Sequence, residues 1–432
     1  MTTTLPAALH FHTLLSHRGG ATRVAHMLAR GLARRGVVVH RTCEILDGDI
    51  SDVDAPKEGT GEGAAEGYAE GGAVHGVVPA AGVGGCLMPG MPLHLHATLD
   101  WTACLGSIVE PGQSSQSSQS GQSSQSGQPE PSGISGGGDR PPSPSLPVSP
   151  VLPVPPVPLV ITVHDCSLLT GGCVYPIDCE GWRTGCPETC PRGYPAAAPL
   201  QDRRASALRA AGPLLVSPSG WLARMVRARF PELPCSVVPN GVDAAGGPPQ
   251  AEARAALGIA PDARVVIFVA HGGEQAMLKG GHRWMALWSE VKRAVPAAVG
   301  LMVGGDAAGR DGDLLRWPYV DRAMLDTLLA ASDVFVYPTL ADNHALVVLE
   351  AMAAGVPVCS FRVGGLPEQV EDGVSGALAE EGDWGGLAVS VAGLLERPRL
   401  ARTLGRAGQD AWRARFTVDR MVEDYLKVYA RL

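Results

Sequence analysis

Two carboxylates in the second half of the chain are spaced so that they could act on one ligand. Asp342 and Glu350 lie eight residues apart within residues 338–358. On a helix this separation is a little over two turns, on the order of 12 Å along the axis, with both side chains on roughly the same side. Carboxylates this far apart cannot share one proton, but they could hold opposite ends of an elongated ligand.

The residues between them predict a short helix with defined ends. Asp342 or Asn343 would cap its start, and Gly355 with Pro357 would end it. The free backbone amides of the first turn would then lie near any phosphate groups of the ligand. A simpler interpretation stays open, in which Asp342 is only a cap and Glu350 is a solvated helix residue.

Alternating strands and helices must position these carboxylates. Residues 8–15 form an apolar run that ends before Gly19 and Gly20, and an amphipathic helix and a strand at 37–39 follow. This βαβ unit predicts a parallel sheet. Further strands are expected at residues 159–163, 214–216, 236–238, 265–269, 300–303 and 334–336.

The turn at residues 239–241 predicts the boundary between two α/β domains. We expect an N-terminal domain at residues 1–240, a C-terminal domain at 241–415 and a final helix at 416–432. A chain of 432 residues with 45% apolar side chains is long enough for two cores of ordinary size.

Two stretches of the first domain have the composition of low-complexity inserts. Residues 57–85 are rich in Gly, Ala and Glu, and residues 110–158 run from Ser-Gln-Ser-Gly repeats into a proline tract. Neither stretch can bury enough apolar surface to offset the entropy lost on ordering. We assign no chemistry to either insert.

The charge of the chain argues against nucleic-acid binding. Its 35 Lys and Arg residues against 43 Asp and Glu residues leave a net charge of −8, without the basic excess of such binders. No basic region followed by an apolar stretch opens the sequence, and the long apolar run at residues 146–163 is broken by six prolines. We therefore expect a cytoplasmic protein, with peripheral contact at the inner membrane as the alternative.

The ten cysteines are expected to be reduced in that compartment. Four of them form a cluster with five, six and three residues between successive members: Cys173, Cys179, Cys186 and Cys190. Four thiolates suit tetrahedral zinc, but the two longer gaps are unusual for a structural zinc site. Unligated structural thiols are the favoured interpretation, and zinc is the alternative.

Several motifs in order resemble the retaining glycosyltransferases of family 4. The matching segments are residues 19–23, 239–243, 279–280, 319–321, 342–350 and 364–368. Residues 164–173 and the cysteines after them are similar to enzymes that build colanic acid and other surface polysaccharides. The resemblance implies a GT-B fold, in which two Rossmann-like domains with parallel sheets face each other across a central cleft. It also implies that the final helix crosses back to the first domain.

The resemblance implies roles for three charged residues of the second domain. Glu350 would hold the ribose hydroxyls of a nucleotide-sugar donor, since a carboxylate accepts two hydrogen bonds from a diol. Asp342 stands where the family usually has Glu and would contact the donor sugar. Lys279 would neutralise the diphosphate as it leaves. The other implied donor-binding residues of this segment are Asn343, His344, Ala345 and Leu346.

Further positions would complete the site. Gly19 and Gly20 would let the backbone of the first domain approach the diphosphate, and Val320 would contact the base through its backbone. His164 follows a parallel strand at the carboxyl edge of the sheet and would line the reacting centre. We therefore expect His164, Lys279 and Asp342 to be catalytic.

The sequence departs from the family at one point. Family members usually have an arginine in the phosphate loop after the first strand of the second domain, whereas residues 269–279 contain none. His271 could replace it only when protonated. No Asp-x-Asp pair follows a strand, which fits a reaction without metal, so we expect no cofactor apart from the nucleotide diphosphate sugar.

The resemblance implies a retaining hexosyltransferase that acts in surface polysaccharide synthesis. It would move a hexose from a nucleotide diphosphate sugar to a hydroxyl of a glycan or lipid-linked acceptor. The alternative is a catalytically weakened relative that binds nucleotide sugars or serves as a scaffold. A dinucleotide-dependent oxidoreductase would need a G-x-G-x-x-G after a strand, and neither Gly19-Gly20 nor Gly304-Gly305 fits that motif.

Overall fold

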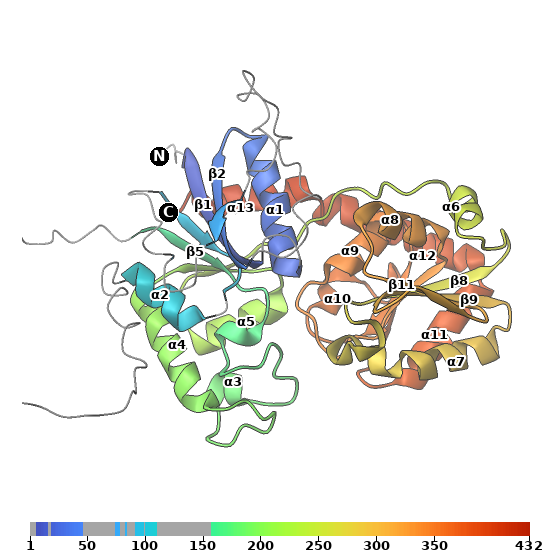
Figure 1. Cartoon of the computed structure of the whole chain (residues 1–432), viewed down its shortest axis with the longest axis horizontal. Coiled ribbons are helices and arrows are strands. Elements are labelled where there is room, and N and C mark those ends of the chain that lie inside the picture. Colours follow the sequence, from blue (N-terminus) through green and yellow to red (C-terminus); the bar gives the residue numbers. More distant parts are fainter. Residues whose placement is uncertain are drawn as a thin grey trace, which may run out of the picture.

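The computed structural model describes residues 6–15, 19–45, 74–77, 83, 91–98, 100–109 and 157–432 of the chain. The described strands form two separate sheets with helices packed around each, one at the left and one at the right of Figure 1. The α/β architecture expected from the alternating pattern is therefore present. No helix in the described part of the chain is both long and apolar enough to cross a membrane.

The first sheet is parallel throughout, with the strand order β3-β2-β1-β4-β5-β6-β7. The order reverses between β1 and β4, and ligands of such sheets bind at the carboxyl ends of the strands on either side of the reversal. Its strands are β1 Ala8–Leu15, β2 Val38–Ile45, β3 Val74–Val77, β4 Leu93–Leu95, β5 Leu159–Thr162, β6 Leu214–Ser217 and β7 Cys235–Val237. The accompanying helices are α1 Gly20–Ala33, α2 Trp101–Val109, α3 Gly181–Thr184, α4 Ala197–Ala211 and α5 Gly220–Arg229.

Strand β3 lies inside the stretch 57–85, for which composition predicts an unordered insert. It pairs in parallel with β2 at the edge of the sheet, through Val74 and Val77 among others. Val83, also in this stretch, is buried. The prediction is therefore wrong for these residues, because backbone pairing with an existing sheet edge stabilises a short segment that has little apolar surface of its own. The rest of 57–85 and residues 110–156 lie outside the described part of the chain.

The second sheet has the order β10-β11-β9-β8-β12-β13-β14 and is parallel except for the β10–β11 hairpin. Its strands are β8 Arg264–Val269, β9 Ala298–Gly305, β10 Gly309–Asp311, β11 Leu314–Pro318, β12 Val334–Tyr337, β13 Val358–Phe361 and β14 Gly376–Ala379. The helices are α6 Gln250–Ala256, α7 Trp284–Ala294, α8 Arg322–Ala331, α9 Leu346–Ala353, α10 Leu366–Gln369, α11 Trp384–Glu396, α12 Pro398–Arg415 and α13 Val418–Tyr429. This order reverses between β8 and β12, so the loops after these two strands meet.

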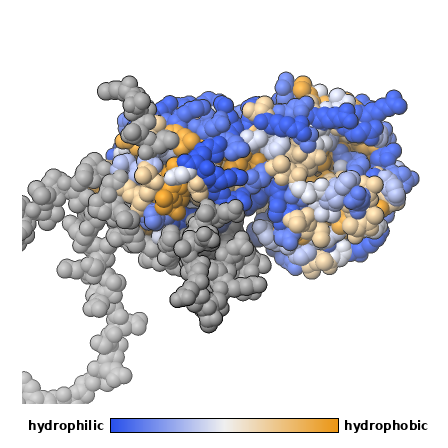
Figure 2. Space-filling view, turned by 90° about the horizontal axis from the view of Figure 1, so that it is seen from above, coloured by the Kyte–Doolittle hydropathy of each residue, from blue (hydrophilic) through white to orange (hydrophobic). Residues whose placement is uncertain are grey.

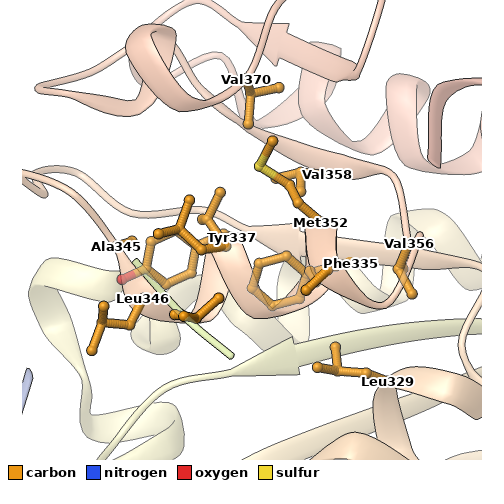
Figure 3. Close-up of a cluster of buried hydrophobic side chains, with 14 of the residues drawn as sticks. Leu329, Phe335, Tyr337, Ala345, Leu346, Met352, Val356, Val358 and Val370 are labelled. Atoms are coloured by element: carbon orange, nitrogen blue, oxygen red, sulfur yellow. The ribbon is translucent and has the colours of Figure 1, made fainter. Parts of the chain in front are cut away.

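A compact apolar cluster holds α9 against β12 and β13 (Figure 3). Phe335 and Tyr337 of β12 have stacked rings whose centroids are 5.8 Å apart. Met352 of α9 and Val358 of β13 are fully buried in the same cluster. This packing places the start of α9, and the loop before it, at the carboxyl edge of the second sheet.

Helix α13 comes at the end of the chain but lies on the first sheet's domain (Figure 1). A Cβ atom at Gly31 of α1 would clash with the side chain of Val422, so a glycine is needed for α1 and α13 to approach this closely. The Tyr425 hydroxyl is 2.7 Å from Thr162 Oγ1, and the Tyr429 hydroxyl is 2.7 Å from His94 Nδ1. The final helix therefore ties the two halves of the molecule together.

Figure 2 shows how hydrophobic and hydrophilic residues are distributed on one face of the molecule. On the face drawn in Figure 2, hydrophobic residues of the second sheet's domain are interspersed with hydrophilic ones. This mixture is ordinary for a folded domain, because there is not enough polar surface to cover one completely.

Candidate functional site

The helix predicted around Glu350 is present but begins later than expected. Helix α9 starts at Leu346 with Ala345 as its N-cap residue, and no side chain caps it. The prediction that Asp342 or Asn343 caps the helix is therefore wrong. These residues lie in a loop that is held by the chain after β13, where the Gly365 amide donates to the Asp342 carbonyl at 3.0 Å.

Asp342 is held by two donors rather than by a helix end. Its Oδ2 accepts from Lys279 Nζ at 2.6 Å and from the Tyr337 hydroxyl at 2.7 Å. Burial and the Asp342 carboxylate raise the pKa of Tyr337 well above its usual value, so Tyr337 stays a neutral donor. The structure thus brings together Lys279 and Asp342, two of the three residues predicted to be catalytic.

Glu350 is fully buried on α9, which rules out the interpretation of a solvated helix residue. Its Oε1 accepts from Arg322 Nη1 of α8 at 2.9 Å and pairs with Arg23 of α1. Burial disfavours the charge of Arg23, but the Glu350 carboxylate, together with Tyr319 and Asp326, outweighs burial and raises the pKa of this arginine. The second oxygen, Oε2, is buried and has no hydrogen-bond partner among the described residues.

Arg23 and Arg322 were not assigned a role from the sequence. Arg23 is the last residue of the glycine motif at 19–23, and Arg322 follows directly after the motif at 319–321. Their positions next to recognised motifs are the only signal in the sequence that could have singled them out. Of these two arginines, Arg23 is the one that connects the domains, because it extends from the first sheet's domain to the Glu350 carboxylate of the second.

Asn343 and Glu368 attach the second domain's loops to the first domain. Asn343 Nδ2 donates to the carbonyls of Val163 and His164 at 3.2 and 3.0 Å. The Glu368 carboxylate accepts from the Gly220 and Trp221 amides at the start of α5, both at 2.6 Å. The Asn343 side-chain amide thus already donates its hydrogen bonds to the first domain. Its predicted contact with a nucleotide-sugar donor stays a prediction.

The neighbours of Asn343 pack into the core. His344 is 5% exposed, and its ring lies edge-on to Phe416 with centroids 5.3 Å apart. Ala345 and Leu346 belong to the apolar cluster under α9 (Figure 3). The structure therefore shows a packing role for all three, and their predicted donor-binding role stays a prediction.

The remaining predicted residues lie at strand ends and loops. Gly19 and Gly20 are exposed at the start of α1, and Gly19 has φ +88°, a conformation that favours glycine. Val320 is half-buried in the loop before α8. His164 follows β5, and its Nε2 is 3.1 Å from His96 Nδ1. Burial lowers the pKa of His164 to about 3, so it is neutral at physiological pH.

Among the described residues, the four clustered cysteines are not grouped as metal ligands would be. Burial is the main cause that raises the pKa of the Cys173 thiol, and the thiols of Cys190, Cys179 and Cys186 add to it. Yet within the described ranges no three His, Cys, Asp or Glu side chains are grouped so that they could hold a metal ion. Zinc ligation by these cysteines is therefore not supported.

Buried histidines make the stability of the fold depend on pH. Burial lowers the pKa of four of them, whereas in the unfolded chain they titrate near the usual value of about 6.5. Their contribution to stability is then fully present above about pH 6.5 and is lost as the pH falls below it. The four residues are His94, His96, His164 and His344.

We expect the free energy of unfolding to fall by about 1.4 kcal/mol per pH unit for each of these histidines below about pH 6.5. Asp165 acts in the opposite sense, because burial raises its pKa, but it is one group against four. Urea unfolding at about pH 7.5 and about pH 5.5 measures the difference. Equal unfolding free energies at the two pH values would contradict the expectation.

Most of the second domain matches a known protein family. Residues 250–411 match the family model described as glycosyl transferases group 1. The matched range includes Lys279, Asp342, Glu350 and Arg322. The residues that meet around the two carboxylates from the second domain's side are thus all within the family region.

Two curated glycosyltransferases are similar to parts of this chain. The D-inositol 3-phosphate glycosyltransferase of Segniliparus rotundus is 35% identical over 211 residues, covering 45% of this chain and 46% of that protein. WcaC of Escherichia coli, a candidate colanic acid biosynthesis glycosyl transferase, is 26% identical over 298 residues, covering 63% of this chain and 68% of that protein. The chain spans about half the length of the first of these relatives.

Solved structures share the fold along nearly the whole chain. The sucrose-phosphate synthase of Thermosynechococcus elongatus has a TM-score of 0.64 at 18% identity, covering 98% of both chains. Anabaena HepE, solved in complex with UDP-glucose, has a TM-score of 0.62 at 18% identity, covering 98% of this chain and 100% of that one. These neighbours confirm the expected GT-B fold. The protein thus has a GT-B fold, and its residues 250–411 are similar to the glycosyl transferases group 1 family.

Proposed function

We propose that the protein is a retaining hexosyltransferase that uses a nucleotide diphosphate sugar. The observation that carries this proposal is the buried Glu350 carboxylate, whose Oε2 has no partner among the described residues. An unpaired buried acceptor costs about 1–3 kcal/mol, and a hydroxyl of the donor ribose would remove that cost. A UDP-sugar is the donor to test first, because HepE was solved with UDP-glucose.

Lys279 and Asp342 would act at the other end of the donor. Lys279 Nζ would offset the charge that develops on the leaving diphosphate. Asp342 positions this ammonium group at 2.6 Å and would itself contact the donor sugar. Because its Oδ2 already accepts two hydrogen bonds, Asp342 is a weak nucleophile, which favours direct transfer over a covalent sugar–enzyme intermediate.

The transfer would then be a displacement on one face of the sugar. The acceptor hydroxyl oxygen bonds to the anomeric carbon as the bond from that carbon to the diphosphate oxygen breaks. The hydroxyl proton passes to the leaving phosphate oxygen, and the configuration is retained. The acceptor would be a glycan or a lipid-linked sugar of surface polysaccharide synthesis, as the similarity to WcaC suggests.

A second candidate function is nucleotide-sugar binding without turnover. It is favoured by the loop after β8, where Lys279 is the single Lys or Arg in residues 269–279. One cation offsets a diphosphate less well than two, and this one is already paired with Asp342. Binding of UDP-glucose without release of UDP would identify this function.

Replacing Glu350 by glutamine tests the proposal. We expect Glu350→Gln to weaken UDP-glucose binding about tenfold or more, because the amide loses the charge and one acceptor position. The measurement is the rise in melting temperature with UDP-glucose concentration, which follows occupancy of the folded state. The control is Glu380→Gln, at an exposed carboxylate paired with Arg362. Equal UDP-glucose responses in wild type and Glu350→Gln would overturn the assignment.

A further inference from the structure

The Glu350 carboxylate is closed off from solvent, although the proposed function requires it to meet a ribose. The residue is fully buried, and its Oε2 atom is among the buried polar atoms without a partner in the described part of the chain. A hydroxyl hydrogen-bonds a carboxylate only when the two oxygens approach to about 2.5–3.0 Å. A group that covers Glu350 must therefore move before a ribose can bind to it.

Two arginines from different domains lie over this carboxylate. Arg322 of α8 and Arg23 of α1 both pair with Oε1. The exposed fraction of the side chain is 35% for Arg322 and 34% for Arg23, but only 1% for Glu350. A buried carboxylate with two partly exposed partners is separated from solvent by them. The two guanidinium groups are thus the cover of Glu350.

The two arginines are not anchored equally. Arg322 also pairs with Asp326, one turn further along the same helix, with Nε 2.9 Å from Oδ1. Both partners of Arg322 belong to the second domain, so this arginine stays beside Glu350 wherever the first domain moves. Arg23 forms an ion pair with Glu350 and, within the described ranges, with no other carboxylate. Arg23 is therefore the part of the cover that can leave.

The surroundings of Arg23 leave room for such a movement. It is the fourth residue of α1, directly after the exposed Gly19 and Gly20. A Cβ atom at Gly20 would meet nothing within 4 Å, so the chain before Arg23 is not tightly packed. Further along α1, Arg30 pairs with Asp243 of the second domain at 2.9 Å. The Arg23 side chain can therefore turn away while a separate ion pair still holds α1 to the second domain.

A ribose would replace what Glu350 loses when Arg23 leaves. The carboxylate keeps its ion pair with Arg322, and an ionised carboxylate has about four acceptor positions on its two oxygens. The two hydroxyls of a ribose diol could then donate to Oε1 and to the unpaired Oε2. Because Arg23 and a ribose need the same face of the carboxylate, they cannot both occupy it.

We propose that Arg23 is an autoinhibitory latch: it covers Glu350, and a donor ribose binds only after the Arg23–Glu350 ion pair between the domains has opened. The inference rests on the proposed function and adds a regulation of the same carboxylate. The affinity for ribose is then reduced by the fraction of molecules in which the latch is open. Binding of the donor also removes one contact between the domains.

Uridine is the probe that isolates the latch, because it has the ribose of the donor without the charge of a diphosphate. Saturation-transfer NMR measures its Kd for the wild type and for Arg23→Ala. We expect uridine to bind about tenfold more tightly to Arg23→Ala, which corresponds to about 1.4 kcal/mol for opening the latch. Arg23→Lys keeps a charge with a shorter reach and should give an intermediate Kd. The melting temperature of each variant verifies that it is folded.

Salt gives a second measurement, which a purely steric effect of Arg23 would not produce. Raising the salt concentration from about 0.1 M to about 1 M screens a partly exposed ion pair. Uridine is neutral, so its own binding has no charge to screen. We therefore expect salt to tighten uridine binding to the wild type more than to Arg23→Ala. An equal salt response of the two proteins would contradict the latch.

The matched control is Arg30→Ala. Arg30 lies on the same helix as Arg23 and pairs across the same domain boundary, but its partner Asp243 is half-exposed and has no part in the proposed site. This variant should bind uridine with the wild-type Kd. Tighter uridine binding by both alanine variants would mean that any loosening of the domains has this effect, which would overturn the specific role of Arg23.

UDP-glucose binding by the same variants separates failure of the latch from failure of the donor site. If Arg23→Ala weakens UDP-glucose binding and leaves uridine binding unchanged, Arg23 binds the diphosphate and is not a latch. If Glu350→Gln weakens UDP-glucose binding while Arg23→Ala keeps both wild-type affinities, the latch is wrong and the donor site stands. If Glu350→Gln binds UDP-glucose like the wild type, both fail. In the double variant, Arg23→Ala should add nothing to Glu350→Gln, because the ion pair is already lost.

Discussion

Replacing Lys279 by alanine is expected to lower the rate of sugar transfer by about 10²-fold or more, because one positioned charge at a leaving group contributes this much. The fold should survive the change. The Lys279 side chain is 29% exposed, and Asp342 keeps its hydrogen bond from the Tyr337 hydroxyl after the lysine is removed. Release of UDP from UDP-glucose, in the presence and absence of acceptor, measures the rate.

A closely matched control is available on α7. The side chain of Lys292 is 30% exposed and donates to the Asp313 carboxylate at 2.6 Å, so its burial and pairing are close to those of Lys279. Lys292→Ala should therefore have a similar small effect on stability and none on transfer. If both alanine variants kept the wild-type rate, Lys279 would have no role at the leaving group.

Replacing Tyr425 by alanine is expected to lower the free energy of unfolding by about 3–5 kcal/mol, the range for truncating a large buried side chain. Tyr425 is fully buried in α13, and its ring lies 5.3 Å from His94 of the first sheet, measured between centroids. The loss should also reduce transfer, because α13 attaches the end of the chain to the domain that contributes Arg23. Urea unfolding and UDP release measure the two effects.

The conservative variant Tyr425→Phe separates packing from hydrogen bonding. It keeps the ring and removes only the hydroxyl bonded to Thr162 Oγ1, so it should cost about 1 kcal/mol. Small-angle scattering compares the overall dimensions of the three proteins. Equal stability of the alanine and phenylalanine variants would show that α13 contributes little packing energy to the first domain.

Much of the fold could be predicted from residue patterns. Apolar runs such as residues 159–163 and 334–336 are strands β5 and β12, because a strand buried on both faces needs a continuous apolar sequence. The GT-B fold was predicted from motifs whose order along the chain is specific. Strand β3 was missed because its pairing with β2 depends on the sheet and not on its own composition.

The site was predicted less completely, and the wrong helix cap has a clear physical cause. The sequence placed Asp342 and Glu350 on one short segment and named Lys279, but it predicted that Asp342 or Asn343 caps the helix. What Asp342 contacts was decided by the chain after β13, whose Gly365 amide holds the loop out of the helix. Local propensity favours a cap, and a tertiary hydrogen bond overrides it.

The amino-acid sequence by itself determined the α/β fold class, and it singled out Asp342, Glu350 and Lys279 as candidate site residues. The fold class follows from periodicity, and the three residues follow from short motifs. Only the tertiary structure decided that Arg23 meets Glu350 across 327 residues of chain, and that His96 and His164 share a hydrogen bond across 68 residues. Such contacts depend on how two domains and adjacent strands pack. A residue's neighbours along the chain carry almost no information about which distant side chain the packing will bring beside it.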